Sequence, residues 1–114
     1  MVETLFIVTS DPRRSHRPAE AIRIAAGVAA WKKVAVHVHL RGPAVLCLDE
    51  FPEELVQGNN IERYLPVLAE EGKVLVQASA PELQGLAQTA AKFTRISDKD
   101  LSSLAARMRY LLHF

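Results

Sequence analysis

Cysteine is almost absent from this sequence: Cys47 is the only one in 114 residues. A single cysteine cannot close an intrachain disulfide, and no CxxC pair is present for a structural zinc site. A disulfide-stapled secreted scaffold is therefore excluded. We expect a cytoplasmic protein that folds in a reducing compartment.

An excess of charge of one sign is also missing. The 14 lysines and arginines nearly balance the 13 aspartates and glutamates, which gives a net charge of +1. A general nucleic-acid binder carries a one-sided basic load. We therefore expect no nucleic-acid partner.

Long apolar runs are missing as well. The first run, residues 5–8, follows the acidic Glu3 and is too short for the apolar part of a signal peptide. Arg23 interrupts the best candidate for a membrane span, which would need about 20 apolar residues. We expect neither a targeting segment nor a membrane partner.

The chain does have the length and apolar content of one small domain. A chain of 114 residues suits one hydrophobic core, so we expect a single domain over residues 1–114. Its 49% hydrophobic content is ordinary for a globular protein, but a mean hydropathy of +0.05 is somewhat apolar for so small a chain. This surplus favours apolar surface that is covered in a homo-oligomer.

Strand-like and helix-like segments alternate along the chain. Residues 4–9 form a near-continuous apolar run, which is typical of an interior parallel strand covered on both faces. Residues 18–32 are rich in alanine and begin with Pro18, which suits the first turn of a helix. The other predicted strands are 33–40, 73–78 and 93–96, and the other predicted helices are 59–71, 81 to 86 or 89, and one after the capping pattern at 97–100.

This alternation predicts βαβ units, and therefore an α/β fold: a three-layer α/β/α sandwich around a parallel sheet. We expect an irregular connection with a helical turn or two over 41–54. Pro66 predicts a kink or restart in its helix, and Gly72 predicts that helix's end. Residues 109–114 either continue the last helix or form a fifth strand.

A site is expected beyond the carboxyl ends of the strands, after Thr9, Leu40 and Ala78. The loop 10–17 contains several cations and precedes a helix N-terminus, an arrangement that favours an anion. Neither GxGxxG nor GxxxxGK[ST] is present, so a solvated basic loop remains the alternative.

His37 and His39 lie two apart on a predicted strand, so both imidazoles project from one face. They would hold a metal only with a third ligand from His16, Cys47, Asp49 or His113, and no such spacing is diagnostic. The favoured interpretation is a half-buried polar face at a subunit contact. We expect no metal and no cofactor.

The order of segments then resembles a known family. The relevant segments are "TSDP", "RPAEAIRIAAGVAA", "LRGPAV", "EEG", "KVLVQASAPELQGL" and "ISDKDLSSLAARMRYLLHF". Over nearly the whole chain they are similar to the DsrE-like superfamily of small sulfur-relay proteins. The resemblance implies a five-stranded parallel sheet whose last strand is 109–114, and assembly into trimers or hexamers.

In the sulfur-transferring members a cysteine at the end of the third strand carries a persulfide. Gln77 stands at the matching position here, and a carboxamide is not a sulfur nucleophile. The favoured hypothesis is therefore a non-catalytic binding or accessory module. Its rim would hold a small anionic or polar ligand or a partner segment, through Ser10, Asp11, Arg13, His16, Gln77 and Ser79.

The alternative is a sulfur carrier, or sulfurtransferase, that uses Cys47 as its catalytic persulfide acceptor and passes sulfur to a relay partner. Arg41 or His16 would then lower the pKa of the thiol. The apolar neighbours of Cys47 favour a buried, inert thiol instead.

Overall fold

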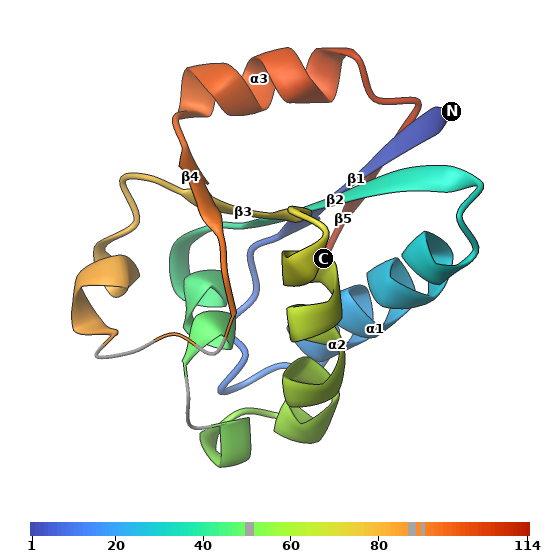
Figure 1. The fold of residues 1–114 in the computed structure, drawn as a ribbon. Coiled ribbons are helices and arrows are strands. Elements are labelled where there is room, and N and C mark those ends of the chain that lie inside the picture. The colour runs from blue at the N-terminus through green and yellow to red at the C-terminus, as the bar shows by residue number, and fades with distance from the viewer. Residues whose placement is uncertain (50–51, 87–88, 90) are drawn as a thin grey trace.

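The computed structural model describes residues 1–49, 52–86, 89 and 91–114. Five parallel strands form one sheet in the order β4-β3-β2-β1-β5, as the α/β prediction required. Figure 1 shows helices on both faces of this sheet, with α1 and α2 on one side and α3 on the other. The strands are β1 Val2–Val8, β2 Val34–Leu40, β3 Val74–Gln77, β4 Thr94–Ile96 and β5 Tyr110–His113. The helices are α1 Arg17–Ala30, α2 Gly58–Glu70 and α3 Asp98–Ala106, with short 3-10 helices η1 Gly42–Leu48, η2 Pro52–Glu54 and η3 Pro81–Gly85.

The main core lies between the sheet and the α1–α2 layer. β1 pairs with β2 on one side and β5 on the other, which explains its near-continuous apolar sequence. Phe6 and Val8 project into this core, where they meet the small buried face of α1 and the apolar face of α2. Alanines on α1 allow the helix to lie close to the sheet.

The opposite face of the sheet has a much thinner cover. Leu5 and His39 are fully buried there, but α3 has no fully buried residue. Its partly buried side chains lie at helical spacing, namely Leu101, Leu104, Ala105 and the following Met108. α3 is therefore the least anchored of the three α-helices.

Three local expectations differ from the structure. α2 begins at Gly58, before the predicted start at residue 59, because Gln57 adopts a left-handed conformation (φ 53°) that redirects the chain. α2 also continues through Pro66, so the helix does not restart there. The predicted helix from residue 81 is a 3-10 helix over Pro81–Gly85; the part of that prediction on residues 87–88 lies outside the described residues.

Other local predictions are confirmed. Gly72 follows the end of α2 with φ +70°, and its N–H and that of Lys73 bond back to carbonyls of α2's last turn. Of the two alternatives for residues 109–114, the structure forms the strand. Connection 41–54 contains the expected helical turns, although residues 50–51 lie outside the described part.

Candidate functional site

The predicted site residues lie on the loops beyond the carboxyl ends of the strands. β1, β2 and β3 are neighbours in the sheet and run in the same direction, so the segments that follow them emerge at one edge. We call this edge the rim. Its side chains form three groups: one around Gln77, one around Asp11 and one around His113.

Gln77 is the last residue of β3 and uses both ends of its amide. Its Oε1 accepts the backbone N–H of Gly42 at 3.0 Å, and its Nε2 donates to the Ser79 hydroxyl at 3.4 Å. Gly42 begins η1 with φ +53°, a conformation that favours glycine. Gln77 therefore fastens the loop after β2 to the end of β3, and it brings Ser79 into the same cluster.

The second group is an ion-paired turn after β1. Arg13 donates three hydrogen bonds to the Asp11 carboxylate, from Nε at 3.1 Å, from Nη2 at 2.9 Å and from its own backbone N–H. These bonds hold the pKa of Asp11 below its usual value. The backbone N–H groups of the next two residues bond to the Asp11 carbonyl and complete the turn. The residues after β1 therefore form a compact turn, and much of Arg13's charge is balanced within it.

His16 and Arg17 stand at the start of α1. His16 is exposed and occupies the N-cap position without a side-chain cap bond. Ser10 lies half-buried between β1 and the turn. Within the described part of the chain no hydrogen bond or ion pair joins this group to Gln77 or Ser79, so the six predicted residues share the rim but form separate clusters.

The sequence did not predict the third group as a site. The Thr9 hydroxyl and His113 Nε2 are 3.1 Å apart, and the Arg17 guanidinium donates to the His113 carbonyl at 3.3 Å. The same guanidinium lies over the Phe114 ring, 5.9 Å from its centroid. The pairing of β5 with β1 creates this cluster, and only the predicted fifth strand could have indicated it.

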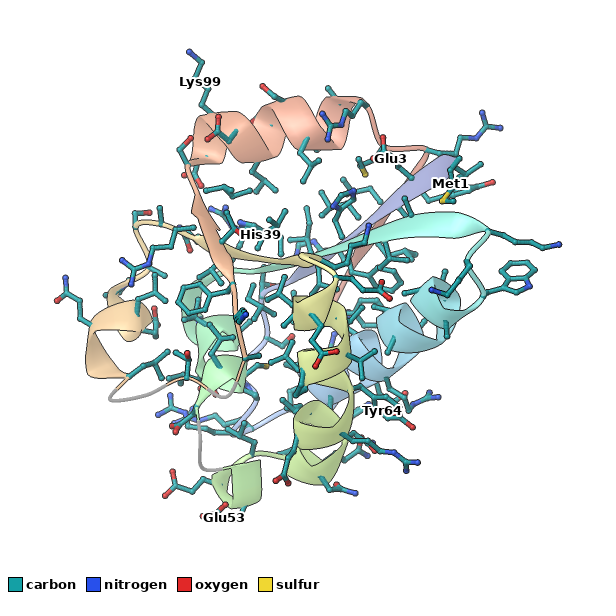
Figure 2. The ribbon with its side chains drawn as sticks, in the orientation of Figure 1. Met1, Glu3, His39, Glu53, Tyr64 and Lys99 are labelled. Carbon is teal, nitrogen blue, oxygen red and sulfur yellow. The ribbon has the colours of Figure 1, made fainter. Side chains whose placement is uncertain are left out.

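The two strand histidines have different environments. His37 is half-buried and lies 3.3 Å from the Glu3 carboxylate. His39 is completely buried, so the expectation of a half-buried polar face is wrong at this position, and Figure 2 shows it on the face of the sheet toward α3. Burial, and then the nearby Arg41 guanidinium, lower the pKa of His39 to about 4. Among the described residues, no cluster of three or more metal-ligating side chains is present.

Cys47 lies inside the core and not on the rim. Its side chain in η1 is 1% exposed, and it belongs to the buried cluster under the sheet. Burial raises the pKa of the thiol far above its ordinary value, and the Asp11 charge acts in the same direction. The thiol is therefore protonated at neutral pH and shielded from reagents.

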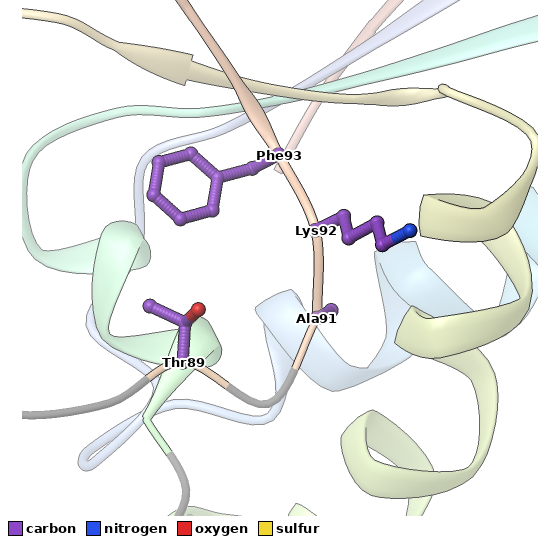
Figure 3. Close-up of a pocket in the computed structure, with 4 residues that line it drawn as sticks. All are labelled: Thr89, Ala91, Lys92 and Phe93. Atoms are coloured by element: carbon purple, nitrogen blue, oxygen red, sulfur yellow. The ribbon is translucent and has the colours of Figure 1, made fainter.

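A separate surface hollow of about 540 Å³ lies beside the segment that leads into β4. Figure 3 shows its lining residues, with Phe93 and Lys92 pointing in opposite directions from that segment. The lining is Thr89, Ala91, Lys92 and Phe93, and includes none of the six predicted rim residues.

These elements, in this order and with these sheet positions, define a DsrE-like fold. The chain is similar in structure to the ychN protein from E. coli, with a TM-score of 0.83, 16% sequence identity and 100% coverage of both chains. No family model matches the sequence. No curated protein matches it significantly either. Among the described residues, no helix is long and apolar enough to span a membrane.

Proposed function

We propose that this chain is a non-catalytic binding or accessory protein built on a DsrE-like fold. The carrying observation is Gln77 at the end of β3, with both polar atoms of its amide engaged in holding neighbouring loops. The only thiol of the chain is buried in the core, with a pKa raised by that burial. Persulfide transfer needs an accessible thiolate, which this arrangement does not provide.

The binding surface of this proposal is the rim. Ser10, Asp11, Arg13 and His16 come from the turn after β1, and Gln77 and Ser79 come from the end of β3. The exposed side chains of Arg13 and His16 would donate hydrogen bonds to an anionic group on a small ligand or on a partner segment, next to the N-terminus of α1. Hydroxyl groups of Ser10 and Ser79 would supply hydrogen bonds.

The proposal includes a homo-oligomer in the cytoplasm, a trimer or hexamer as in the family that the sequence resembles. The edge strand β5 supports self-association, because three successive residues, Tyr110, Leu111 and Leu112, are 42–57% exposed. An open edge with exposed apolar side chains is a common site of pairing with another chain.

A sulfur-loading experiment tests the absence of relay chemistry. The chain is incubated with a cysteine desulfurase and cysteine, and intact mass is measured for wild type, Cys47→Ala, and Gln77→Cys made in the Cys47→Ala background. We expect no sulfur adduct on wild type, and an adduct on the Gln77→Cys chain because its thiol stands at the end of β3. A wild-type adduct that disappears in Cys47→Ala would instead establish the sulfur-carrier alternative.

A titration tests the rim as an anion site. Thermal unfolding is followed while phosphate or thiosulfate is added, and wild type is compared with the Arg13→Gln, His16→Gln double variant. Arg63→Gln, an exposed change on α2, is the matched control. We expect the anion to raise the melting temperature of wild type and the control more than that of the double variant. An equal rise in all three would refute the assignment of these two side chains to an anion site.

A further inference from the structure

His39 is a polar side chain buried with no partner. Its exposed fraction is 0%, and neither ring nitrogen has a hydrogen-bond partner among the described residues. Leaving buried polar atoms unpaired costs free energy, and natural structures seldom retain such atoms without a reason. The register places Ile7 of β1 and Leu75 of β3 on either side of it, so the imidazole has apolar neighbours within the sheet.

α3 covers this imidazole. Figure 2 shows His39 on the side of the sheet that faces α3. The inward residues of α3 are apolar and only partly buried, whereas α1 has six fully buried residues. Elements with little buried apolar area are the ones that open first in a native protein.

Charged contacts hold α3 at both ends. Near its start, the Arg41 guanidinium lies 2.9 Å from the Asp98 carboxylate. Just beyond its end, Arg107 lies 3.8 Å from the carboxylate of Glu3. On the sheet side, Glu3 belongs to β1 and Arg41 follows β2 directly. These two contacts therefore join α3 to the sheet on the face that contains His39.

The charged groups around His39 do little to stabilise its protonated form. The Arg41 charge opposes protonation, and the Asp98 charge, already paired with Arg41, favours it. On the same strand face, His37 is paired with Glu3 and lies two residues away. The paired positions on β1 and β3 carry no charge, and His113 of β5 is bonded to Thr9.

We propose that α3 is an acid-sensitive lid on the sheet, and that protonation of His39 opens it. In the closed form the imidazole is neutral and sealed between the sheet and α3. When α3 lifts, water reaches the ring nitrogens and the ring accepts a proton as an ordinary histidine does. The open form then exposes His37, His39 and the apolar face around Leu5, while the core under α1 and α2 stays intact.

The direction of the pH effect follows from linkage. The pKa of His39 is about 4 in the closed form against 6.5 for a solvated histidine. Because closure lowers the pKa of His39, the neutral imidazole stabilises the closed form fully at pH values above 6.5, the pKa of the open form. This stabilisation is lost as the pH falls from 6.5 towards 4, the pKa of the closed form. With these two values the opening equilibrium is about 20-fold larger at pH 5 than at pH 7.

Hydrogen exchange on the full chain tests the lid. Amide exchange is measured at pH 7 and pH 5 and corrected for the intrinsic chemical rate at each pH. We expect α3 amides to open about 20-fold more at pH 5, whereas α1 amides keep their protection. His39→Leu and His39→Gln carry no titrating group at this position, so both should lose most of the pH response, and Arg63→Gln, an exposed change on α2, should keep it.

Further exchange measurements test the proposed opening of α3. Asp98→Asn removes the contact with Arg41, so we expect more opening of α3 at both pH values with the pH ratio unchanged. Equal α3 protection at pH 7 and pH 5 in wild type would overturn the proposal. So would a pH response that survives in His39→Leu, or a simultaneous loss of protection in α1, which would indicate global unfolding. None of these outcomes depends on sulfur loading or on ligand binding at the rim.

Discussion

At the scale of single residues, Gln77 explains most about this rim. A thiol at the end of β3 would have at most one weak hydrogen bond to offer, whereas a carboxamide provides an acceptor and a donor together. Gln77 uses the acceptor on Gly42 and the donor on Ser79. The side chain at the end of β3 is thus used here to hold the loops around it.

Replacing this amide should loosen the rim. Gln77→Ala leaves the half-buried N–H of Gly42 without its acceptor, so we expect a loss of about 1–3 kcal/mol in the free energy of unfolding. Urea denaturation measures this loss. Gln77→Glu is the matched control, because its carboxylate still accepts from Gly42 and the Ser79 hydroxyl can donate to it. If Gln77→Ala is as stable as wild type, the amide does not hold the loop.

The thiol of Cys47 gives a second residue-scale prediction. Its burial and raised pKa should make alkylation by iodoacetamide at neutral pH very slow in the folded chain, and fast in denaturant. Gln77→Cys in the Cys47→Ala background serves as the exposed-rim comparison and should react without denaturant. Rapid labelling of native wild type, with the fold intact by circular dichroism, would show that η1 opens and would reinstate Cys47 as a candidate nucleophile.

At the scale of elements, the sequence predicted what depends on neighbours along the chain. The apolar run of β1, the proline at the start of α1 and Gly72 after α2 are local signals, and all three agree with the structure. The predicted start of α2 was wrong because Gln57 adopts a left-handed conformation that redirects the chain. Glutamine has no preference for that conformation, so the sequence gives no sign of it. Alternation placed His39 on the correct face of β2, but its full burial depends on α3, which lies about 60 residues further along the chain.

α3 should be sensitive to its cap because it has little else to stabilise it. Its nine residues begin after Ser97, whose hydroxyl accepts the Asp100 N–H at 3.1 Å. Ser97→Ala removes this acceptor, and we expect a loss of about 1 kcal/mol in the stability of α3. Hydrogen exchange of the α3 amides measures that loss locally. Ser102→Ala, an exposed change within the same helix, should leave exchange unchanged or slightly slower, and equal exchange in both variants would contradict the capping role.

At the scale of the whole molecule, the two faces and the two edges of the sheet differ. One face has a dense core under α1 and α2, and the other has one lightly anchored helix. Sequence patterns predicted the layers, because layers follow from local periodicity. They predicted the rim only in outline: the carboxyl ends do meet at one edge, but the contacts that divide it into three groups come from pairings such as Thr9 with His113, which are remote in sequence.

The exposed edge at β5 bears on whether the chain associates with further copies of itself. β5 pairs with β1 on one side only, and Leu111 at its centre is 50% exposed beside Tyr110 and Leu112. Apolar side chains on an open edge are unfavourable in water, and a charge placed there prevents pairing with another chain. If the proposed homo-oligomer pairs through β5, Leu111→Lys should therefore yield a monomer.

Light scattering coupled to size exclusion at micromolar concentration measures this change. We expect wild type to elute with the mass of a trimer or hexamer and Leu111→Lys with the mass of one chain. Val67→Lys, on α2 with the same 50% exposure but away from the edge, should keep the wild-type mass. A monomeric wild type would refute self-association altogether. An oligomer that survives Leu111→Lys but not Val67→Lys would move the interface from β5 to α2, because a charge disrupts assembly only where the second chain covers it.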